Sequence, residues 1–498
     1  MCRNSAKRLW LLSAWIISLL ILPLKCAATA ELIREWEWRS GPISNPEGLP
    51  TYFYMDPHLL RSGADLYFVQ KLPYGTFSVG EETVSTERGR TGSIIGKLSS
   101  EGKLLWHKII GNGSTLDLQG FGPDREGNIT VAGSFLVGTV TFEDGSTFDH
   151  GDPFTLGRFD LVVAKFTSSG ELLWAKGTSN QEGMRIEAGT QDAAGNTYLF
   201  GSGDTLRYDG VACTNYNKVL LKLDSDGRAV WLKNFPFVGF IYDACTTSDG
   251  GITFAATAGM NDSFAKTSLS TGSMVVGRFS GNGDQLSVAS LRGTGTIWAE
   301  KLALDEQGQG VVYGIANRSV LPGTVPVAGG KPNPEFGSPV LLGFRDGKFT
   351  WIRYDYGGSV DRFGGETFFL AESNSTNEAL YRVADDGKMS LLATSPIGGD
   401  GTHLKMFSPT NGYIFAESQF IAITGFRAPP PPPALAMTRN SEGVLTLTWP
   451  PAAGYVLERS TTLAVNSWHL LEGSSTPPVV IQPTALQAVE FFRLRRVP

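Results

Sequence analysis

The residues of this 498-residue chain that could do chemistry are few and scattered. Asp224-Ser-Asp226-Gly227 and Asp385-Asp386-Gly387 resemble parts of a calcium-binding loop, in which several oxygen ligands follow one another at regular spacing. Each segment lacks the third carboxylate that such a loop requires. The same residue types are typical of tight turns, because Asp hydrogen-bonds to its own backbone and Gly accepts a positive φ. We therefore interpret both segments as turns and predict no metal site.

The sequence contains no other pattern that indicates catalysis. Its histidines do not pair at the spacing of zinc ligands; they are His58, His107, His150, His403 and His469. It has no Gly-x-Ser-x-Gly motif of the kind that presents a nucleophilic serine. Its glycine-rich stretches do not precede a helical pattern, so they do not predict a phosphate-binding loop. We predict no catalytic residue and no bound cofactor.

The first thirty residues have the pattern of a secretory signal peptide. Arg3, Lys7 and Arg8 precede an uncharged apolar run from Leu9 to Leu22, and Ala28-Thr29-Ala30 offers a small-residue cleavage site. An uncleaved membrane anchor is the alternative, but the apolar run is short for a membrane span. We expect residues 1–30 to be removed, with membrane contact only through the signal peptide before cleavage. The mature protein would then be secreted, periplasmic or at the cell surface.

Charge argues against a nucleic-acid partner. The formal net charge is −6, and loss of the four cations of the signal peptide (Arg3, Lys7, Arg8 and Lys25) changes it to −6 − 4 = −10. A chain with this charge and no basic stripe is not expected to bind phosphate backbones.

Two cysteines, Cys213 and Cys245, remain after the signal peptide. In an exported chain they could form one disulfide, and both readings, a disulfide or two buried thiols, stay open at this point. One bridge cannot hold a chain of this length, so the fold must depend on a large apolar core.

A glycine stands four residues before a tryptophan at four places, and this spacing is an internal repeat. The tryptophans are Trp106, Trp174, Trp231 and Trp351. Each ends a segment in which a run of apolar residues, a polar turn and a second apolar run follow one another, as in Val162 to Lys176. Such runs, rich in β-branched and aromatic residues, are typical of paired β-strands. We interpret the repeated tryptophans as packing between repeats rather than as a sugar-binding surface, which is the alternative.

A second kind of hairpin alternates with the first and sets the period. Its turn glycines recur at intervals of 48 to 68 residues, at Gly63, Gly127, Gly195, Gly250, Gly308, Gly364 and Gly412. One period therefore holds two hairpins, or four strands, which is the composition of a β-propeller blade. The sequence predicts an all-β fold with a propeller over residues 31–427. Seven blades are favoured and six are the alternative.

The two ends of this region are expected to share a blade. Trp36 and Trp38 resemble the tryptophan strand of the repeat but have no hairpin before them, and the last hairpin lacks such a strand. A closing blade built from both ends would leave no exposed sheet edge.

A smaller second domain is expected after the propeller. Five consecutive prolines at 429–433 indicate an extended linker over residues 428–434. Residues 435–498 contain short strand patterns, such as Val444 to Trp449 and Tyr455 to Arg459. They predict a small antiparallel sandwich of the immunoglobulin or fibronectin type.

The hairpin Asp-x-x-Gly-Asn followed by Ala-Lys-Phe-x-x-x-Gly-x-x-x-Trp-Ala-Lys resembles the bacterial SBBP-type β-propeller repeat. Residues 121–235 match best, and residues 52–120 and 236–425 match in a degraded way. The resemblance implies an exported propeller and supplies no catalytic residues. The glycine–tryptophan element is also similar to propellers of pyrroloquinoline-quinone dehydrogenases, but this chain lacks their adjacent cysteine pair.

These observations favour a non-catalytic exported propeller that binds an unknown protein or glycan. We expect binding at the central channel or at the longest loops, Phe142 to Phe159 and Asn317 to Pro339, because loops on a rigid scaffold commonly carry function. The alternative is an enzyme, either a quinone-dependent dehydrogenase or a carbohydrate-active hydrolase, since propellers support many chemistries.

Overall fold

The computed structural model describes residues 33–40, 58–72, 74–87, 90, 92–151, 158–214, 217–317, 325–330, 337–354, 357–373, 377–395, 403–416, 422–427, 435–440, 444–449, 455–460, 468–471, 477–481 and 491–496. Within these ranges the only regular elements are β-strands, numbered β1 to β43. The predicted signal peptide and proline linker lie outside the described residues. The chain divides into two compact units, one formed by residues 31–428 and one that includes residues 429–498.

Most strands in the described part of residues 31–428 belong to seven sheets of one plan. Sheet 1 contains β2 (His58–Ser62), β3 (Asp65–Lys71), β6 (Ser93–Leu98) and β7 (Leu104–Ile110). Sheet 2 contains β8 (Asp117–Phe121), β9 (Ile129–Phe135), β12 (Asp160–Phe166) and β13 (Leu172–Gly177). Sheet 3 contains β14 (Arg185–Gln191), β15 (Thr197–Ser202), β18 (Lys218–Leu223) and β19 (Ala229–Phe235). Sheet 4 contains β20 (Phe240–Thr246), β21 (Ile252–Thr257), β24 (Met274–Phe279) and β25 (Gln285–Leu291).

The remaining three sheets vary this plan slightly. Sheet 5 contains β26 (Ile297–Leu304), β27 (Gly310–Ala316), β29 (Ser338–Arg345) and β30 (Lys348–Tyr354), with β28 (Val327–Gly329) as a fifth strand. Sheet 6 contains β31 (Gly358–Phe363), β32 (Glu366–Ser373), β33 (Asn377–Val383) and β34 (Met389–Ser395). Sheet 7 contains β35 (His403–Met406), β36 (Asn411–Ala416), β37 (Ala422–Arg427) and β1 (Ile33–Arg39).

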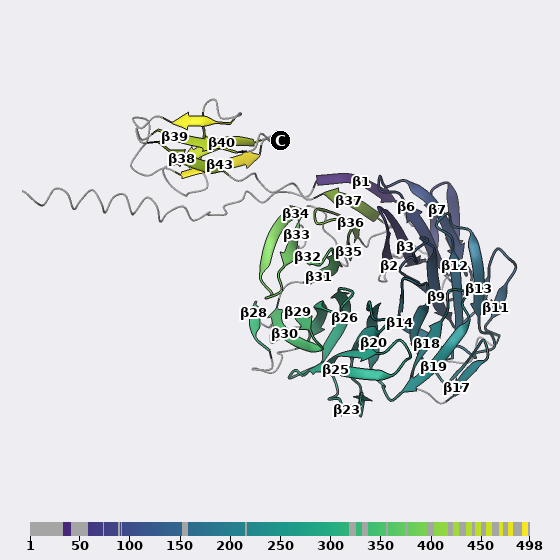
Figure 1. The fold of residues 1–498 in the computed structure, drawn as a ribbon. Helices are drawn as coiled ribbons and strands as arrows, with labels where there is room; N and C mark the ends of the chain where they lie inside the picture. Colours follow the sequence, from purple (N-terminus) through teal and green to yellow (C-terminus); the bar gives the residue numbers. More distant parts are fainter. Residues whose placement is uncertain are drawn as a thin grey trace, which may run out of the picture. The chain divides into compact units, whose positions relative to one another are not determined.

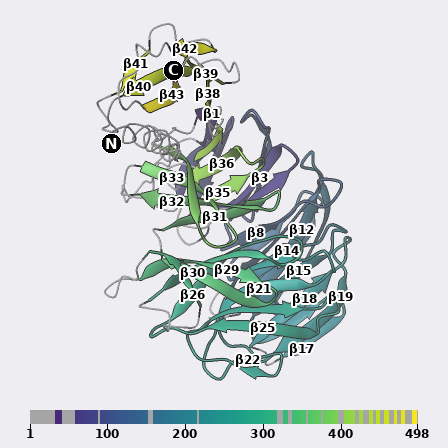
Figure 2. The same ribbon diagram turned by 60° about the vertical axis from the view of Figure 1, so that its left-hand side comes forward.

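The sheets form a closed ring. The first strand of each sheet contacts the first strand of the next, and β35 of sheet 7 contacts β2 of sheet 1. We call these first strands the inner strands and the fourth strands the outer strands. Figures 1 and 2 show the sheets following one another around the ring in chain order, from purple through teal to green. Four-stranded antiparallel sheets in a closed ring are the architecture of a β-propeller.

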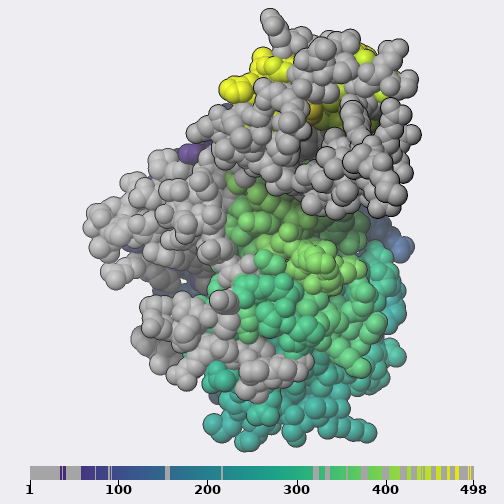
Figure 3. Space-filling view, turned by 90° about the vertical axis from the view of Figure 1, so that its left-hand side faces the viewer, coloured from purple at the N-terminus to yellow at the C-terminus, as the bar shows by residue number. Residues whose placement is uncertain are grey.

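Apolar cores between neighbouring sheets hold the ring together. The second and third strands are covered on both faces, so every residue of β9 and of β12 is buried. This double burial explains why their sequences are nearly continuous apolar runs rather than alternating patterns. One core joins Tyr67 and Val69 of sheet 1 to Leu118 and Val131 of sheet 2. In the space-filling view, the green residues of sheet 6 lie directly beside the teal residues that precede them in the chain (Figure 3).

Sheet 7 combines the two ends of this unit. The strand β1 pairs antiparallel with β37, with Trp38 opposite Ile423. The ring of Trp38 lies 5.2 Å from that of Phe68, which belongs to sheet 1. Trp36 stands opposite Gly425 in the same pairing. The N-terminal strand therefore fills the outer position of a sheet whose other three strands come from residues 403–427.

The glycine–tryptophan repeat marks contacts between consecutive sheets. Trp106 of sheet 1 lies on Gly170 of sheet 2, where a Cβ atom would be 2.6 Å from the indole ring. Trp174 lies on Gly227 of sheet 3 in the same way, again at 2.6 Å. Each indole Nε1 also donates a 3.1 Å hydrogen bond across the sheet boundary, to the carbonyl oxygens of Ser168 and Ser225 respectively. The repeated glycine is thus the socket that receives the tryptophan of the preceding sheet.

The same contact recurs where the repeat is complete and is missing where it is broken. Trp231 lies on Gly283, and Trp351 lies on Gly387. Sheet 4 has Ser287 at the position of the tryptophan, opposite Arg278 in the strand pairing. Consistent with this, no atom lies within 4 Å of a Cβ built on Gly347, the corresponding glycine of sheet 5.

Short additional hairpins, which the repeat pattern did not predict, separate the second and third strands of sheets 1 to 4. They are β4 (Gly75–Val79) with β5 (Glu82–Thr86), β10 (Thr139–Thr141) with β11 (Thr147–Asp149), β16 (Thr205–Tyr208) with β17 (Val211–Thr214), and β22 (Ser263–Phe264) with β23 (Thr267–Ser268). They turn back toward the outer strand: Glu143 accepts a hydrogen bond from the amide of Leu172, and Asp209 accepts one from that of Ala229. In sheet 5 this role falls to β28, which pairs in parallel with β30. Covering an outer edge in this way restricts pairing with other chains.

The two cysteines are not bonded to each other, which corrects the disulfide alternative. Cys213 lies in β17, which packs on the outer strand β19, whereas Cys245 lies in the inner strand β20. The width of a four-stranded sheet, roughly 14 Å at about 4.8 Å a strand, separates an inner from an outer strand. Burial raises the pKa of both thiols, so the two side chains remain protonated near neutral pH.

The second unit contains two small sheets. One is formed by β38 (Ala436–Arg439), β39 (Leu445–Thr448) and β42 (Val479–Ile481), and the other by β40 (Tyr455–Ser460), β41 (His469–Leu470) and β43 (Phe491–Arg496). Their side chains share one apolar core, in which Trp449 and Leu447 meet Leu457 and Phe492. In the part of the chain that the structure describes, no helix has the length and apolar character to cross a membrane.

Candidate functional site

Three neighbouring inner strands carry a β-bulge at the same place, near their starts. The register shifts around Glu187 in β14, around Tyr242 in β20 and around Glu300 in β26. A bulge inserts one extra residue and redirects its side chain, and bulges are common beside functional sites. The strand β20 contacts both β14 and β26, and the three strands lie in succession along the ring (Figure 1). Because each bulge lies near the start of its strand, these three polar residues lie at one end of the inner strands.

The electrostatics of Tyr242 confirm that the three side chains are neighbours. Burial raises the pKa of its phenol, and the carboxylates of Glu300 and Glu187 raise it further, while a hydrogen bond with Thr257 opposes the shift. The phenol therefore stays protonated near neutral pH and can act as a hydrogen-bond donor.

Glu187 is fully engaged in holding the site together. Its carboxylate accepts hydrogen bonds from Lys218 at 2.6 Å, from Ser202 at 2.8 Å and from the amide of Ile241 at 3.2 Å. The side chains of Glu187 and Lys218 are each 5% exposed. Since Ile241 belongs to β20 and the other partners to sheet 3, this carboxylate ties two sheets together.

Four large apolar side chains are exposed at this end of β20. They are Val238, Phe240, Tyr242 and Met260, with exposed fractions of 53%, 55%, 36% and 71%. We call them the axial cluster. The rings of Phe240 and Tyr242 lie 6.4 Å apart, and the ammonium group of Lys218 lies 5.7 Å from the centre of the Phe240 ring. Single exposed apolar residues are ordinary, but a group of them on one strand end is typical of a binding surface.

A buried carboxylate fixes the two loops that carry this cluster. Asp262 is 1% exposed and accepts hydrogen bonds from the amides of Val238, Gly239 and Gly259, at 2.5, 3.0 and 2.6 Å. The two loops approach so closely that a Cβ on Gly239 would lie 1.9 Å from the carbonyl oxygen of Thr257. The exposed side chains therefore stand on a preorganised backbone, which lowers the entropic cost of binding.

Another group of charges on the inner strands joins three sheets. Asp361 of β31 accepts hydrogen bonds from the amide of Met406 at 2.7 Å and from Lys405 at 3.1 Å, and Arg61 of β2 lies 3.5 Å away. Arg61 also donates to the carbonyl oxygens of Met406 and Arg362. Burial lowers the pKa of Lys405, Asp361 opposes this shift, and the cation of Arg61 adds to it. This group, which we call the closing latch, connects sheet 1 to sheets 6 and 7.

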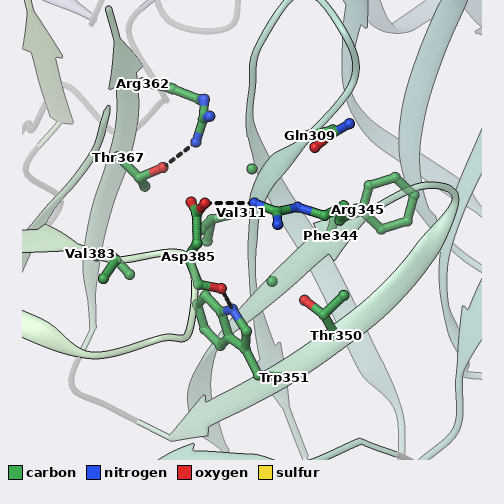
Figure 4. A pocket seen from close by; sticks show the side chains of 13 residues that line it. Gln309, Val311, Phe344, Arg345, Thr350, Trp351, Arg362, Thr367, Val383 and Asp385 are labelled. Carbon is green, nitrogen blue, oxygen red and sulfur yellow. Dashed lines mark hydrogen bonds and ion pairs between the residues drawn. The ribbon is translucent and has the colours of Figure 1, made fainter. Parts of the chain in front are cut away.

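A small cavity lies between sheets 5 and 6, where the strand pairing departs from that of the other repeats (Figure 4). Sheets 1 to 3 have a lysine opposite the repeat tryptophan, as in the pair Lys165 and Trp174, whereas sheet 5 has Gly343 opposite Trp351. The indole lies over this glycine, and its Nε1 donates to the carbonyl oxygen of Asp385 at 2.8 Å. The remaining cavity of about 20 Å³ has room for about one water molecule. It is therefore not a ligand site.

The residues that the sequence singled out lie mostly away from the axial cluster. Trp106, Trp174, Trp231 and Trp351 lie at the boundaries between sheets, and nothing is described of the Trp36 side chain. The aspartates of the calcium-like segments form turns: Asp224 accepts from the amides of Asp226 and Arg228. The described residues contain no group of three or more His, Cys, Asp or Glu side chains placed to hold a metal ion.

Binding was also predicted at two long loops, Phe142 to Phe159 and Asn317 to Pro339. Their described parts contact outer strands and not the axial cluster. Residues 147–149 belong to the hairpin tied to β13, and residues 327–329 form β28 on the outer strand β30. The axial cluster was missed by sequence reasoning. Its signal was the aromatic run from Phe235 to Tyr242, in which buried and exposed residues alternate in the structure.

Comparisons with known proteins add little beyond the fold. No protein-family model and no curated protein matched the chain. Among solved structures, the WD40 domain of Neurospora crassa Pan2 has 9% sequence identity and a TM-score of 0.45, covering 81% of this chain and 98% of that one. A structure of streptogramin B lyase has 12% identity and a TM-score of 0.38, covering 78% and 98%. These similarities are too low to carry an argument, so the propeller assignment rests on the sheet order and ring contacts of the chain itself.

Proposed function

We propose that this chain is an exported, non-catalytic β-propeller that binds a protein or glycan partner at the axial cluster. The observation that carries the proposal is the exposure of Val238, Phe240 and Met260 on loops that Asp262 holds rigid. Exposed apolar side chains on a fixed backbone lose little entropy on binding and gain the area they bury.

The finer description of the fold is part of the same proposal. Seven sheets of one plan support seven blades, closed by the mixed sheet 7. Two three-stranded sheets around one core support a small sandwich of the immunoglobulin or fibronectin type for residues 435–498. The repeat residues quoted above support a relation to SBBP-type propellers. The pattern of residues 1–30 supports export to the periplasm, the cell surface or the medium.

An enzymatic role has weaker support at this site. A glycoside hydrolase needs two carboxyl groups that flank a substrate, one of them able to transfer a proton. Glu187 is instead buried and engaged by Lys218, Ser202 and a backbone amide. We therefore favour binding without catalysis over a quinone-dependent dehydrogenase or a carbohydrate-active hydrolase.

The proposal can be tested with two matched double variants of the mature protein. Phe240→Ser with Met260→Ser removes apolar surface from the axial cluster, and Leu105→Ser with Leu286→Ser removes it from outer strands, where exposure is 46% and 51%. Wild type and both variants would be applied to a glycan array and to an array of random peptides. We expect the first variant to lose at least tenfold in affinity for the strongest binder, or about 1.4 kcal/mol, and the second to keep it. Equal binding by all three proteins would refute the assignment.

A further inference from the structure

We propose a second binding site, for a neutral saccharide unit, in a groove between sheets 2 and 3 at the ends opposite the axial cluster. The groove has a volume of about 440 Å³, within the range of about 300–1,000 Å³ for small-ligand sites. Its walls include Asp124, Glu126, Asn128, Leu173, Trp174 and Asp226. It lies at the turns that follow the inner strands, whereas the axial cluster lies where β20 begins.

The floor of the groove is held rigidly by groups from both sheets. The ammonium group of Lys165 lies 2.8 Å from the carboxylate of Asp124, and the two side chains are 6% and 7% exposed. Lys165 and Trp174 both donate to the carbonyl oxygen of Ser225 across the boundary, at 3.4 and 3.1 Å. Burial acts to raise the pKa of Asp124, but hydrogen bonds from Lys165 and Asn128 outweigh it, so the pKa is lowered and the carboxylate stays ionised.

The groove is open because one turn of sheet 3 carries only small side chains. The turn Asp192-Ala-Ala-Gly195 occupies the position of Asp124-Arg-Glu-Gly127 in sheet 2 and Asp305-Glu-Gln-Gly308 in sheet 5. All three turns have the same geometry, since each aspartate accepts a hydrogen bond from the amide two residues further on, at 2.9 to 3.0 Å. Ala193 and Ala194 therefore leave free a volume that long side chains would occupy in the other turns.

The lining suits a saccharide better than a charged ligand. Trp174 and Leu173, which is 49% exposed, present apolar surface that a sugar ring can cover with its CH groups. The carboxylate oxygens of Glu126 and Asp226 line the groove and can accept hydrogen bonds from hydroxyl groups. The amide nitrogen of Asn128 holds Asp124 and Glu126 in place, with hydrogen bonds of 3.1 and 3.0 Å. The cations Arg125 and Lys165 offset two of the three carboxylates, so the groove has little net charge to attract an ion.

The test fills the groove with the side chains that the equivalent turn of sheet 2 carries. Ala193→Arg with Ala194→Glu gives sheet 3 the turn sequence of sheet 2. Glu306→Ala with Gln307→Ala makes the converse change in sheet 5 and serves as the control. Binding of a panel of neutral disaccharides, each up to about 10 mM, would be measured by saturation-transfer NMR on the mature protein, since weak sites have Kd values of about 1 mM.

We expect at least one disaccharide to bind the wild type and the control, and the filled variant to lose at least tenfold in affinity. No binding to the wild type, or unchanged binding to the filled variant with its melting temperature preserved, would overturn the proposal. Preferential binding of a lysine-rich peptide in the groove would overturn the saccharide class. Saccharide binding that responds only to the Phe240 and Met260 substitutions would assign it to the axial cluster and also overturn this proposal.

Discussion

At the scale of single residues, the repeat glycine leaves the space that the tryptophan of the preceding sheet fills. Gly170 and Gly227 each take a positive φ, of 89° and 71°, in the turn before their own tryptophan. Each also leaves room for the indole of the preceding sheet. A glycine is therefore required twice over, by the turn and by the close approach of Trp106 or Trp174.

The two requirements can be separated with two alanine variants. Gly227 and Gly347 have nearly equal φ, 71° and 72°, but only Gly227 has a tryptophan in its socket. Gly347→Ala is expected to cost about 1–2 kcal/mol of stability because an alanine is strained at positive φ. Gly227→Ala should cost about 1–3 kcal/mol more, because the new methyl overlaps the ring of Trp174. Denaturant unfolding monitored by tryptophan fluorescence would measure the stability of both variants. Equal losses would contradict the claim that the contact with Trp174 requires a glycine at position 227.

The sequence allowed the tryptophans to be interpreted as packing residues because their spacing repeats. It did not reveal the axial cluster, since the run from Phe235 to Tyr242 has aromatic residues on both faces. The structure buries Phe235 and Phe237 and exposes Phe240 and Tyr242. Nor did it settle the state of Cys213 and Cys245. Their separation along the chain suited neighbouring repeats, but one lies on an outer hairpin and the other on an inner strand.

At the scale of elements, the additional hairpins restrain the outer strands. Glu143, near the tip of the β10–β11 hairpin, accepts hydrogen bonds from Lys108 of sheet 1 at 2.6 Å and from the amide of Leu172 at 3.1 Å. It therefore links two neighbouring outer strands. These hairpins escaped sequence reasoning because their strands have two to five residues, too few for an alternating pattern to stand out.

This link predicts a pH dependence of the hairpin. The hydrogen bond from Lys108 lowers the pKa of Glu143, burial opposes this shift, and the amide of Leu172 lowers the pKa further. A carboxyl whose folded-state pKa is lowered stabilises above its unfolded value, about 4.3, and this stabilisation is lost as the pH falls through the folded-state pKa. Glu143→Gln should therefore speed amide exchange of residues 139–149 at pH 7 relative to wild type. The difference should shrink as the pH falls through the lowered pKa of Glu143; a difference that is unchanged at acid pH would contradict the role of the charge.

At the scale of the whole molecule, the ring depends on joining residues 33–39 to residues 403–427. Backbone pairing of β1 with β37 closes sheet 7 on its outer side. On the inner side, the closing latch of Arg61, Asp361 and Lys405 connects that sheet to both of its neighbours. The mixed closing sheet was foreseen from Trp36 and Trp38, whereas the latch joins residues about 300 positions apart and had no local signal.

Removal of the latch carboxylate should weaken the closure. Asp361→Asn leaves Arg61 and Lys405 without their compensating charge. Because these two side chains are partly exposed, by 26% and 22%, the change should cost about 1.5–3 kcal/mol, the range for hydrogen bonds to charged groups. Adding Lys405→Met removes one of the two cations that Asp361→Asn leaves uncompensated, and it should recover part of the lost stability. Thermal unfolding of the single and double variants would measure both effects. A double variant less stable than the single one would show that Lys405 contributes independently of Asp361.

The proposal that a partner binds at the axial cluster is tested most directly by hydroxyl-radical footprinting of the protein, with and without its strongest array binder. Phe240 and Met260 are exposed by 55% and 71% and are reactive toward the radical, as is Leu286 on the outer strand β25. The account predicts that the binder protects Phe240 and Met260 while Leu286 is labelled as before. Unchanged labelling of Phe240 and Met260 in the bound state would contradict it.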